Sequence, residues 1–260
     1  MKASTTRGKK IAYILISAVF WTALWDFASH IVNMKYVFPS PASTFGRLFE
    51  LMITKRFYVH AGNSLFSIIK GFVGGALIGT VLGILSALIT GMDILFSPLN
   101  TVIRATPVAS FIILAFIWMD NRDIPVLISV LMITPIVWSA LKTAISNVDP
   151  QLKEMAACYK MSLKRRVVDL YIPSVLPTYL TSLVTAMGLG WKAGIAAEVL
   201  CGSANTLGND LSEAKRYLEV TDQFALTVAI VILSVIMELA FKALIKKITS
   251  REVTHEHKDQ

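Results

Sequence analysis

The chain of 260 residues is 55% hydrophobic and only 16% charged, and its formal net charge is +8. Soluble domains carry about 25% charged residues, so this chain has too few charged side chains to cover a water-exposed surface. The apolar composition excludes a disordered or collagen-like chain, and two cysteines far apart in the sequence exclude a small disulfide-linked scaffold. The remaining class is a membrane protein.

Six stretches poor in charged residues are each long enough for a transmembrane helix, which needs about 20 mostly apolar residues. The predicted spans are residues 11–32, 64–92, 94–119, 124–145, 170–200 and 223–245. The third is interrupted by Arg104 and Pro107, so we expect it to be kinked. The sequence therefore predicts an all-α fold in which residues 1–260 form a single bundle of six transmembrane helices.

The distribution of basic residues predicts the orientation of the bundle. If the N-terminus is cytoplasmic, the inner segments hold 15 Lys and Arg residues and the outer segments hold 8. Because cytoplasmic loops are enriched in these residues, we expect both termini in the cytoplasm. No small-residue cleavage site follows Trp25, so we expect the first span to be retained rather than removed as a signal peptide. The Lys and Arg residues of the inner segments then face anionic lipid headgroups. The sequence offers no basic soluble face of the kind that binds nucleic acid.

Two features lie before the third span. The first outer segment opens with Pro39-Ser40-Pro41 and continues with apolar residues at helical spacing, which predicts a short amphipathic helix on the membrane surface. In the second span, glycines recur every four residues, at Gly71, Gly75, Gly79 and Gly83. They lie along one helix face, where another backbone can approach closely, and we interpret them as a packing surface. A surface that slides during a conformational cycle is compatible with the same pattern.

The inner loop between the fourth and fifth spans is longer than a simple connector needs to be. Asp149 can cap a helix that has Pro150 in its first turn, and Glu154 follows in the next turn. A short helix of this kind, rich in small residues, has a shape that fits a groove in a partner protein.

Residues 149–173 resemble the EAA loop of the membrane permeases of binding-protein-dependent ABC importers. In that loop, Glu-Ala-Ala is followed by three residues, a glycine, nine residues and Ile-x-Leu-Pro. Here Glu154, Met155 and Ala156 hold the opening positions, Lys160 the glycine position and Pro173 the proline position. Glycine would allow a left-handed turn at this point, whereas a lysine in that conformation costs about 1–2 kcal/mol.

The resemblance is to the nitrate, sulfonate and taurine branch of this family, in which methionine is common at the second position. Short stretches elsewhere resemble the same branch, namely 39–41, 60–65, 104–107 and 196–198. The resemblance implies a multi-pass permease of the bacterial cytoplasmic membrane that translocates a small, anionic solute and catalyses no reaction. Importers of bicarbonate and of vitamins or their precursors belong to the same branch, and a vitamin precursor is the alternative cargo.

The resemblance also implies partners. A second copy of the permease would complete the pathway as a homodimer, an extracytoplasmic binding protein would deliver the solute, and two cytoplasmic ATPases would drive the cycle. ATP and Mg²⁺ would bind the ATPases, because this chain has no phosphate-binding Gly-x-x-x-x-Gly-Lys-Ser/Thr loop and no cofactor of its own is expected. The residues that would contact the ATPase are Glu154, Met155, Ala156, Ala157, Lys160, Ser162 and Pro173.

Charged residues within the spans are candidates for the solute pathway. Arg104 and Lys192 could attract an anion there, or could instead pair with polar groups inside the bundle. Glu198 is expected to serve a hydrogen bond or the outer docking surface. Glu238 and Lys242 lie four residues apart in the order that favours an ion pair on one helix.

Two other classes of membrane protein are alternatives. A gradient-driven carrier would place acidic residues in mid-span, and only Glu198 meets that description. A membrane-embedded enzyme would need converging catalytic groups, which the sequence does not offer. We expect no metal site, because His30, His60, His255 and His257 lack the spacing of zinc ligands.

Overall fold

The computed structural model describes residues 3–32, 34 and 37–256, and within these the side chains of residues 9, 12–32, 34 and 37–247. Some of the Lys and Arg residues counted for the orientation lie outside this description, namely Lys2, Lys35 and Lys258, and so do the side chains of Arg7, Lys10 and Arg251. The same holds for His257 and for the side chain of His255. The described part of the chain is 86% helix and contains no strand, which confirms the predicted all-α fold.

Among the described residues, five helices are long and apolar enough to cross a membrane, and a bent pair of helices makes a sixth candidate span. The elements are α1 (Ala3–Val32), α2 (Pro41–Ile53), α3 (Lys55–Leu88), α4 (Thr90–Ala105), α5 (Val108–Ala115), α6 (Ile124–Ser146), α7 (Pro150–Cys158), α8 (Leu163–Arg165), the π-helix η1 (Arg166–Tyr171), α9 (Ile172–Cys201), α10 (Leu207–Arg216) and α11 (Val220–Glu256).

The structure departs most from the prediction at the third span, which the sequence predicts to be one kinked helix. The chain there forms α4 and α5, which are bent by 98° at a short break. Thr106 is extended, with φ −78° and ψ 130°, and Pro107 caps α5. Because a proline disfavours the helical conformation of the residue before it and has no N–H to donate, the helix stops here rather than curving through.

α3, α6 and α9 form the centre of the bundle. The four glycines of α3 face α6, where a Cβ on Gly75 would lie 2.8 Å from Ile133 Cβ, and a Cβ on Gly79 2.7 Å from the Thr134 carbonyl oxygen. Ile133 is itself fully buried. The missing side chains therefore let the two helix backbones approach closely.

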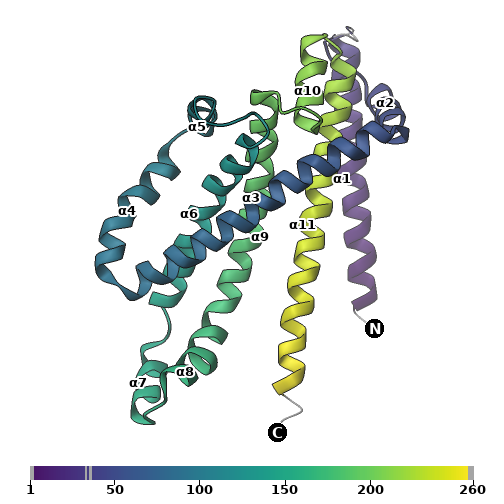
Figure 1. Ribbon diagram of the computed structural model, residues 1–260. Helices are drawn as coiled ribbons and strands as arrows, with labels where there is room; N and C mark the ends of the chain where they lie inside the picture. The colour runs from purple at the N-terminus through teal and green to yellow at the C-terminus, as the bar shows by residue number, and fades with distance from the viewer. Residues whose placement is uncertain (1–2, 33, 35–36, 257–260) are drawn as a thin grey trace.

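The two ends of the bundle carry different elements. Figure 1 shows the start of α1, the end of α11, α7 and α8 at the lower end, and α2, α5 and α10 at the upper end. We call these the lower and upper ends below. The predicted amphipathic helix is α2, in which Pro41, Thr44 and Leu48 are buried.

Candidate functional site

α7 projects from the lower end of the bundle and is defined by its caps (Figure 1). The Asp149 carboxylate accepts a hydrogen bond from the Gln151 N–H at 2.8 Å, and Pro150 is the first helical residue. At the other end, the Met161 N–H donates to the Ala156 carbonyl and the Lys160 N–H donates to the Ala157 carbonyl, both at 3.0 Å. This pair of bonds is a Schellman motif, which needs a left-handed residue at the position of Lys160. Lys160 has φ 46°, so it adopts the conformation that glycine would favour.

One side of α7 is fixed to the bundle and the other is free. Ala156 is 1% exposed and packs with Leu141, Leu170 and Val175 from α6, η1 and α9. Glu154 and Ala157 are exposed beside it. We call the exposed apolar side chains here the α7 tip, which comprises Leu152, Met155, Tyr159 and Leu163. Ser162 is exposed and precedes α8 without a side-chain cap bond, and Pro173 is exposed as the second residue of α9.

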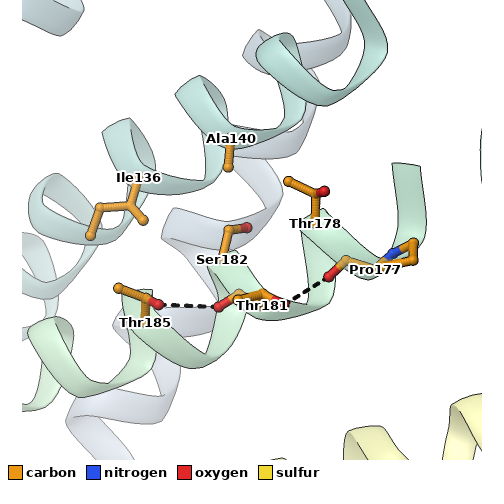
Figure 2. A pocket seen from close by; sticks show the side chains of 7 residues that line it. All are labelled: Ile136, Ala140, Pro177, Thr178, Thr181, Ser182 and Thr185. Carbon is orange, nitrogen blue, oxygen red and sulfur yellow. Dashed lines mark hydrogen bonds between the residues drawn. The ribbon is translucent and has the colours of Figure 1, made fainter. Parts of the chain in front are cut away.

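A polar face runs along α9 in the membrane-spanning part. A cavity of about 480 Å³ lies between Ile136 and Ala140 of α6 and the hydroxyl-bearing side chains of α9 (Figure 2). The Thr181 hydroxyl donates to the Pro177 carbonyl at 2.9 Å, and the Thr185 hydroxyl donates to the Thr181 carbonyl at 3.2 Å. The hydroxyl protons of Thr181 and Thr185 are used within the helix, so these two oxygens offer lone pairs to the cavity rather than donors.

Lys192 continues this polar face toward the upper end. Thr181 and Thr185 also line a second cavity of about 660 Å³, which reaches Lys192 on α9 and Glu238 and Lys242 on α11. Glu238 and Lys242 form an ion pair with each other. Lys192 is exposed and has no ion pair among the described residues, so its charge is available at the edge of this cavity.

Arg104 lies elsewhere. It is exposed on α4, and its guanidinium donates to the Ser139 hydroxyl oxygen on α6 at 3.3 Å. The Asn100 amide donates to the same oxygen at 3.0 Å. Arg104 and Lys192 thus have different neighbours, and neither of the two cavities along α9 is lined by both.

The upper end is held together by polar contacts that the sequence analysis largely missed. Glu198 is fully buried, and one of its carboxylate oxygens accepts from the Ser64 hydroxyl at 2.7 Å and from the Gly208 N–H at 3.1 Å. The same Ser64 oxygen accepts from the Leu207 N–H at 3.0 Å. Of the two roles expected for Glu198, the structure shows the hydrogen bond, which fastens the start of α10 to α3 and α9.

Ion pairs near α2 and α10 add to this framework. Arg47 is bidentate to Asp222, at 2.7 and 2.9 Å, and these hydrogen bonds raise the pKa of Arg47 above its ordinary value. Arg56 and His60 both contact Asp210, each at 2.7 Å. These partners are more than 140 residues apart in the sequence, so no local pattern signals them. No group of three His, Cys, Asp or Glu side chains within the described residues could hold a metal ion.

Comparison with protein families decides what kind of protein carries these features. Residues 79–251 match the family of the binding-protein-dependent transport system inner membrane component. The chain belongs to this family. The predicted ABC importer permease is therefore confirmed, and with it a multi-pass inner-membrane protein whose ATPase is a separate subunit. The gradient-driven carrier and the membrane-embedded enzyme are set aside.

Curated relatives cover most of the chain. It is 24% identical to the taurine transport system permease protein TauC of Escherichia coli K12, over 89% of this chain and 86% of TauC. It is 23% identical to the aliphatic sulfonates transport permease protein SsuC of Bacillus subtilis 168, over 87% of this chain and 81% of SsuC. It is 27% identical to the nitrate import permease protein NrtB of Synechococcus elongatus, over 73% of this chain and 71% of NrtB.

Solved structures agree on the fold. An amino acid ABC transporter crystallised with histidines is similar with a TM-score of 0.62 and 19% identity, over 78% of this chain and 97% of that chain. A bacterial alginate ABC transporter, in complex with an alginate-bound periplasmic protein, is similar with a TM-score of 0.55 and 14% identity, over 95% of this chain and 96% of that chain.

Proposed function

We propose that this permease carries a small anionic solute and that α7 couples it to a cytoplasmic ATPase. The observation that carries the coupling role is the two-sidedness of α7. Ala156 is buried against α6, η1 and α9, while Met155 and Tyr159 are 46% and 79% exposed. An exposed apolar patch rimmed by charged residues is typical of a protein–protein contact.

The α7 tip would seat in a groove of the ATPase, with Glu154 and Ala157 at its edge. Because Ala156 contacts three elements of the bundle, a shift of α7 would be passed to α6 and α9 together. Lys160 would fix the direction of the chain that leaves α7, and Ser162 and Pro173 would fix the starts of α8 and α9. ATP and Mg²⁺ would act on the partner, and the switching of this chain would be a rigid-body movement biased by the partner's nucleotide state.

The proposed cargo is anionic for two reasons. The relatives above are named for nitrate and aliphatic sulfonates, which are anions, and for taurine, which carries a sulfonate together with an ammonium group. On this chain, Lys192 lies unpaired at the end of the α9 polar face, and Arg104 is exposed on α4. Since charges within a membrane protein are costly unless they line a pathway or are paired, both are candidates for contact with the solute.

The assembly would follow from the two ends of the bundle. The start of α1, the end of α11 and α7 lie at the lower end, which we assign to the cytoplasm because of its excess of Lys and Arg (Figure 1). The binding protein would dock at the upper end, on α2, α5 and α10. A second copy of this chain would close the pathway along the open polar face of α9.

Two native cysteines allow the coupling role to be tested. Cys158 is exposed on α7, and Cys201 is buried, so a membrane-impermeant maleimide should label Cys158 and spare Cys201. We expect assembly with the ATPase to slow the labelling of Cys158 by tenfold or more, and intact cells to exclude the reagent from it. Labelling at the same rate with and without the ATPase would contradict the proposal, and labelling from outside intact cells would contradict the orientation.

Charge reversal at Glu154 tests function directly. In proteoliposomes that hold the permease, the ATPase and the binding protein, Glu154→Lys should abolish the stimulation of ATP hydrolysis by loaded binding protein. Glu154→Gln, which keeps the shape of the side chain, is the matched control and should retain most of it. Normal transport by Glu154→Lys would refute the coupling role.

Titration calorimetry of the companion binding protein with nitrate, taurine and alkanesulfonates tests the cargo, and binding of uncharged solutes alone would refute the anionic cargo.

A further inference from the structure

A separate cavity of about 510 Å³ opens near the lower end of the bundle, among α3, α6, α8, η1 and α9. Its volume is that of a ligand pocket rather than of a packing defect. The walls are mostly apolar and include Ile84, Leu88, Ile145, Val167, Ile172 and Leu176. Two polar wall groups, the hydroxyls of Thr80 and Tyr179, hydrogen-bond to each other at 2.9 Å and so require no polar ligand.

Arg166 is the exception in this wall. Its Nε is buried and has no hydrogen-bond partner, and its side chain makes no ion pair with any described residue. A buried, unpaired guanidinium nitrogen is costly, because it loses its hydration without a replacement acceptor. Arg166 is the one charged side chain among the residues that line the cavity, and no carboxylate lies in its wall. The neighbouring Lys164 and Arg165 are exposed and do not line it.

The cavity also coincides with an irregularity of the helix. The Ile172 N–H donates to the Val167 carbonyl, five residues back, and Pro173 has no N–H to restore the α-helical pattern. The widened turn η1 carries Arg166, Val167 and Tyr171, all of which line the cavity. Single π-helical turns of this kind are frequent at functional sites.

We propose that this cavity is an anionic-phospholipid site, in which an acyl chain lies along the apolar wall and the phosphate accepts from Arg166. A bilayer supplies this ligand at the required depth, since the basic segment Lys164–Arg166 lies at the start of a membrane span, near the lower end of the bundle (Figure 1). Apolar walls with a single basic group at the rim match a lipid better than a free anion, which would need several donors and no apolar surface. The site does not depend on the identity of the cargo, and of the α7 tip only Leu163 lines the cavity.

The charge of the headgroup provides the first test. Delipidated full-length protein in detergent micelles is titrated with dioleoyl phosphatidylglycerol or with dioleoyl phosphatidylcholine, and bound lipid is counted by native mass spectrometry. We expect one phosphatidylglycerol per chain, held about tenfold more tightly than phosphatidylcholine. Arg166→Gln should remove this preference, whereas Arg165→Gln, at an exposed neighbour, should keep it. A preference that survives Arg166→Gln, or its absence from the unaltered protein, would overturn the proposal.

The acyl chain provides the second test. Ile172→Trp should fill the cavity and weaken the binding of both lipids, while Ile113→Trp, which is exposed on α5, is the matched control and should not. Each variant is compared with the unaltered chain for elution volume and melting temperature, so that misfolding is recognised.

Inorganic phosphate that displaces the lipid completely at millimolar concentration would reduce the site to a simple anion site. Loss of the bound lipid on assembly with the ATPase would show that a protein partner covers the cavity. Either result would overturn the proposal.

Discussion

The contact between α3 and α6 allows a prediction with opposite signs at two glycines. In Gly79→Ala the new Cβ would lie 2.7 Å from the Thr134 carbonyl oxygen and 2.9 Å from Val137 Cβ. Neither atom can rotate away, so the two helices must separate. Overpacking of this kind costs about 1–3 kcal/mol, and the better helix propensity of alanine returns about 0.5–1 kcal/mol. We therefore expect Gly79→Ala to lower the free energy of unfolding by about 0.5–2 kcal/mol.

Gly188→Ala is the matched control, because a Cβ there would meet nothing within 4 Å. It lies within α9, and we expect it to raise the free energy of unfolding by about 0.5–1 kcal/mol through helix propensity alone. The measurement is reversible unfolding by sodium dodecyl sulfate in mixed micelles, followed by tryptophan fluorescence. If Gly79→Ala is as stable as Gly188→Ala, the close packing of α3 on α6 described here is wrong.

Two further predictions concern single residues. Lys160→Gly should raise the free energy of unfolding by about 0.5–1 kcal/mol in the same assay, because the relief of left-handed strain exceeds the added entropy of the unfolded chain. A lower stability would instead show that the Lys160 side chain stabilises α7. Glu198→Ala should lower it by about 2–4 kcal/mol, because the Gly208 N–H and the Ser64 hydroxyl lose a buried acceptor. Glu198→Gln retains an acceptor oxygen, and a loss equal to that of Glu198→Ala would contradict this account.

Much of the fold follows from hydropathy and local signals. Charge-free stretches mark the helices because a bilayer admits few charges, and the caps of α7 follow from Asp149 and Pro150. The extent of individual elements follows less well. α3 begins at Lys55, ahead of the predicted span at 64, because the capping Thr54 starts a helix in the upper region that runs directly into the membrane. A hydropathy pattern registers only the apolar part of such a helix.

The site residues divide in the same way. The exposed tip of α7 could be expected from its spacing, whereas the separation of Arg104 from Lys192 could not, because it depends on how sharply α4 and α5 bend at Pro107. The polar face of α9 had a signal in the spacing of Thr178, Thr181 and Thr185 within an uncharged span. That signal is weak, since a threonine in a helix often only bonds to its own backbone, as two of these do.

The packing indicates how a movement of α7 would spread. Ala156 touches the lower half of α6 through Leu141, and Leu141 in turn faces Gly83 of α3, where a Cβ would lie 3.0 Å away. With no intervening side chain, α3 and α6 cannot slide past one another without backbone contact, so we infer that they move as one body with α7. α4 and α5 pack less extensively on α6 than α3 does, and one of their contacts is the hydrogen bond from Arg104 to Ser139. On the proposed function, the change between inward and outward states would therefore occur at the joints of α4 and α5 and at the surface of the second copy, and not within the α3–α6 pair.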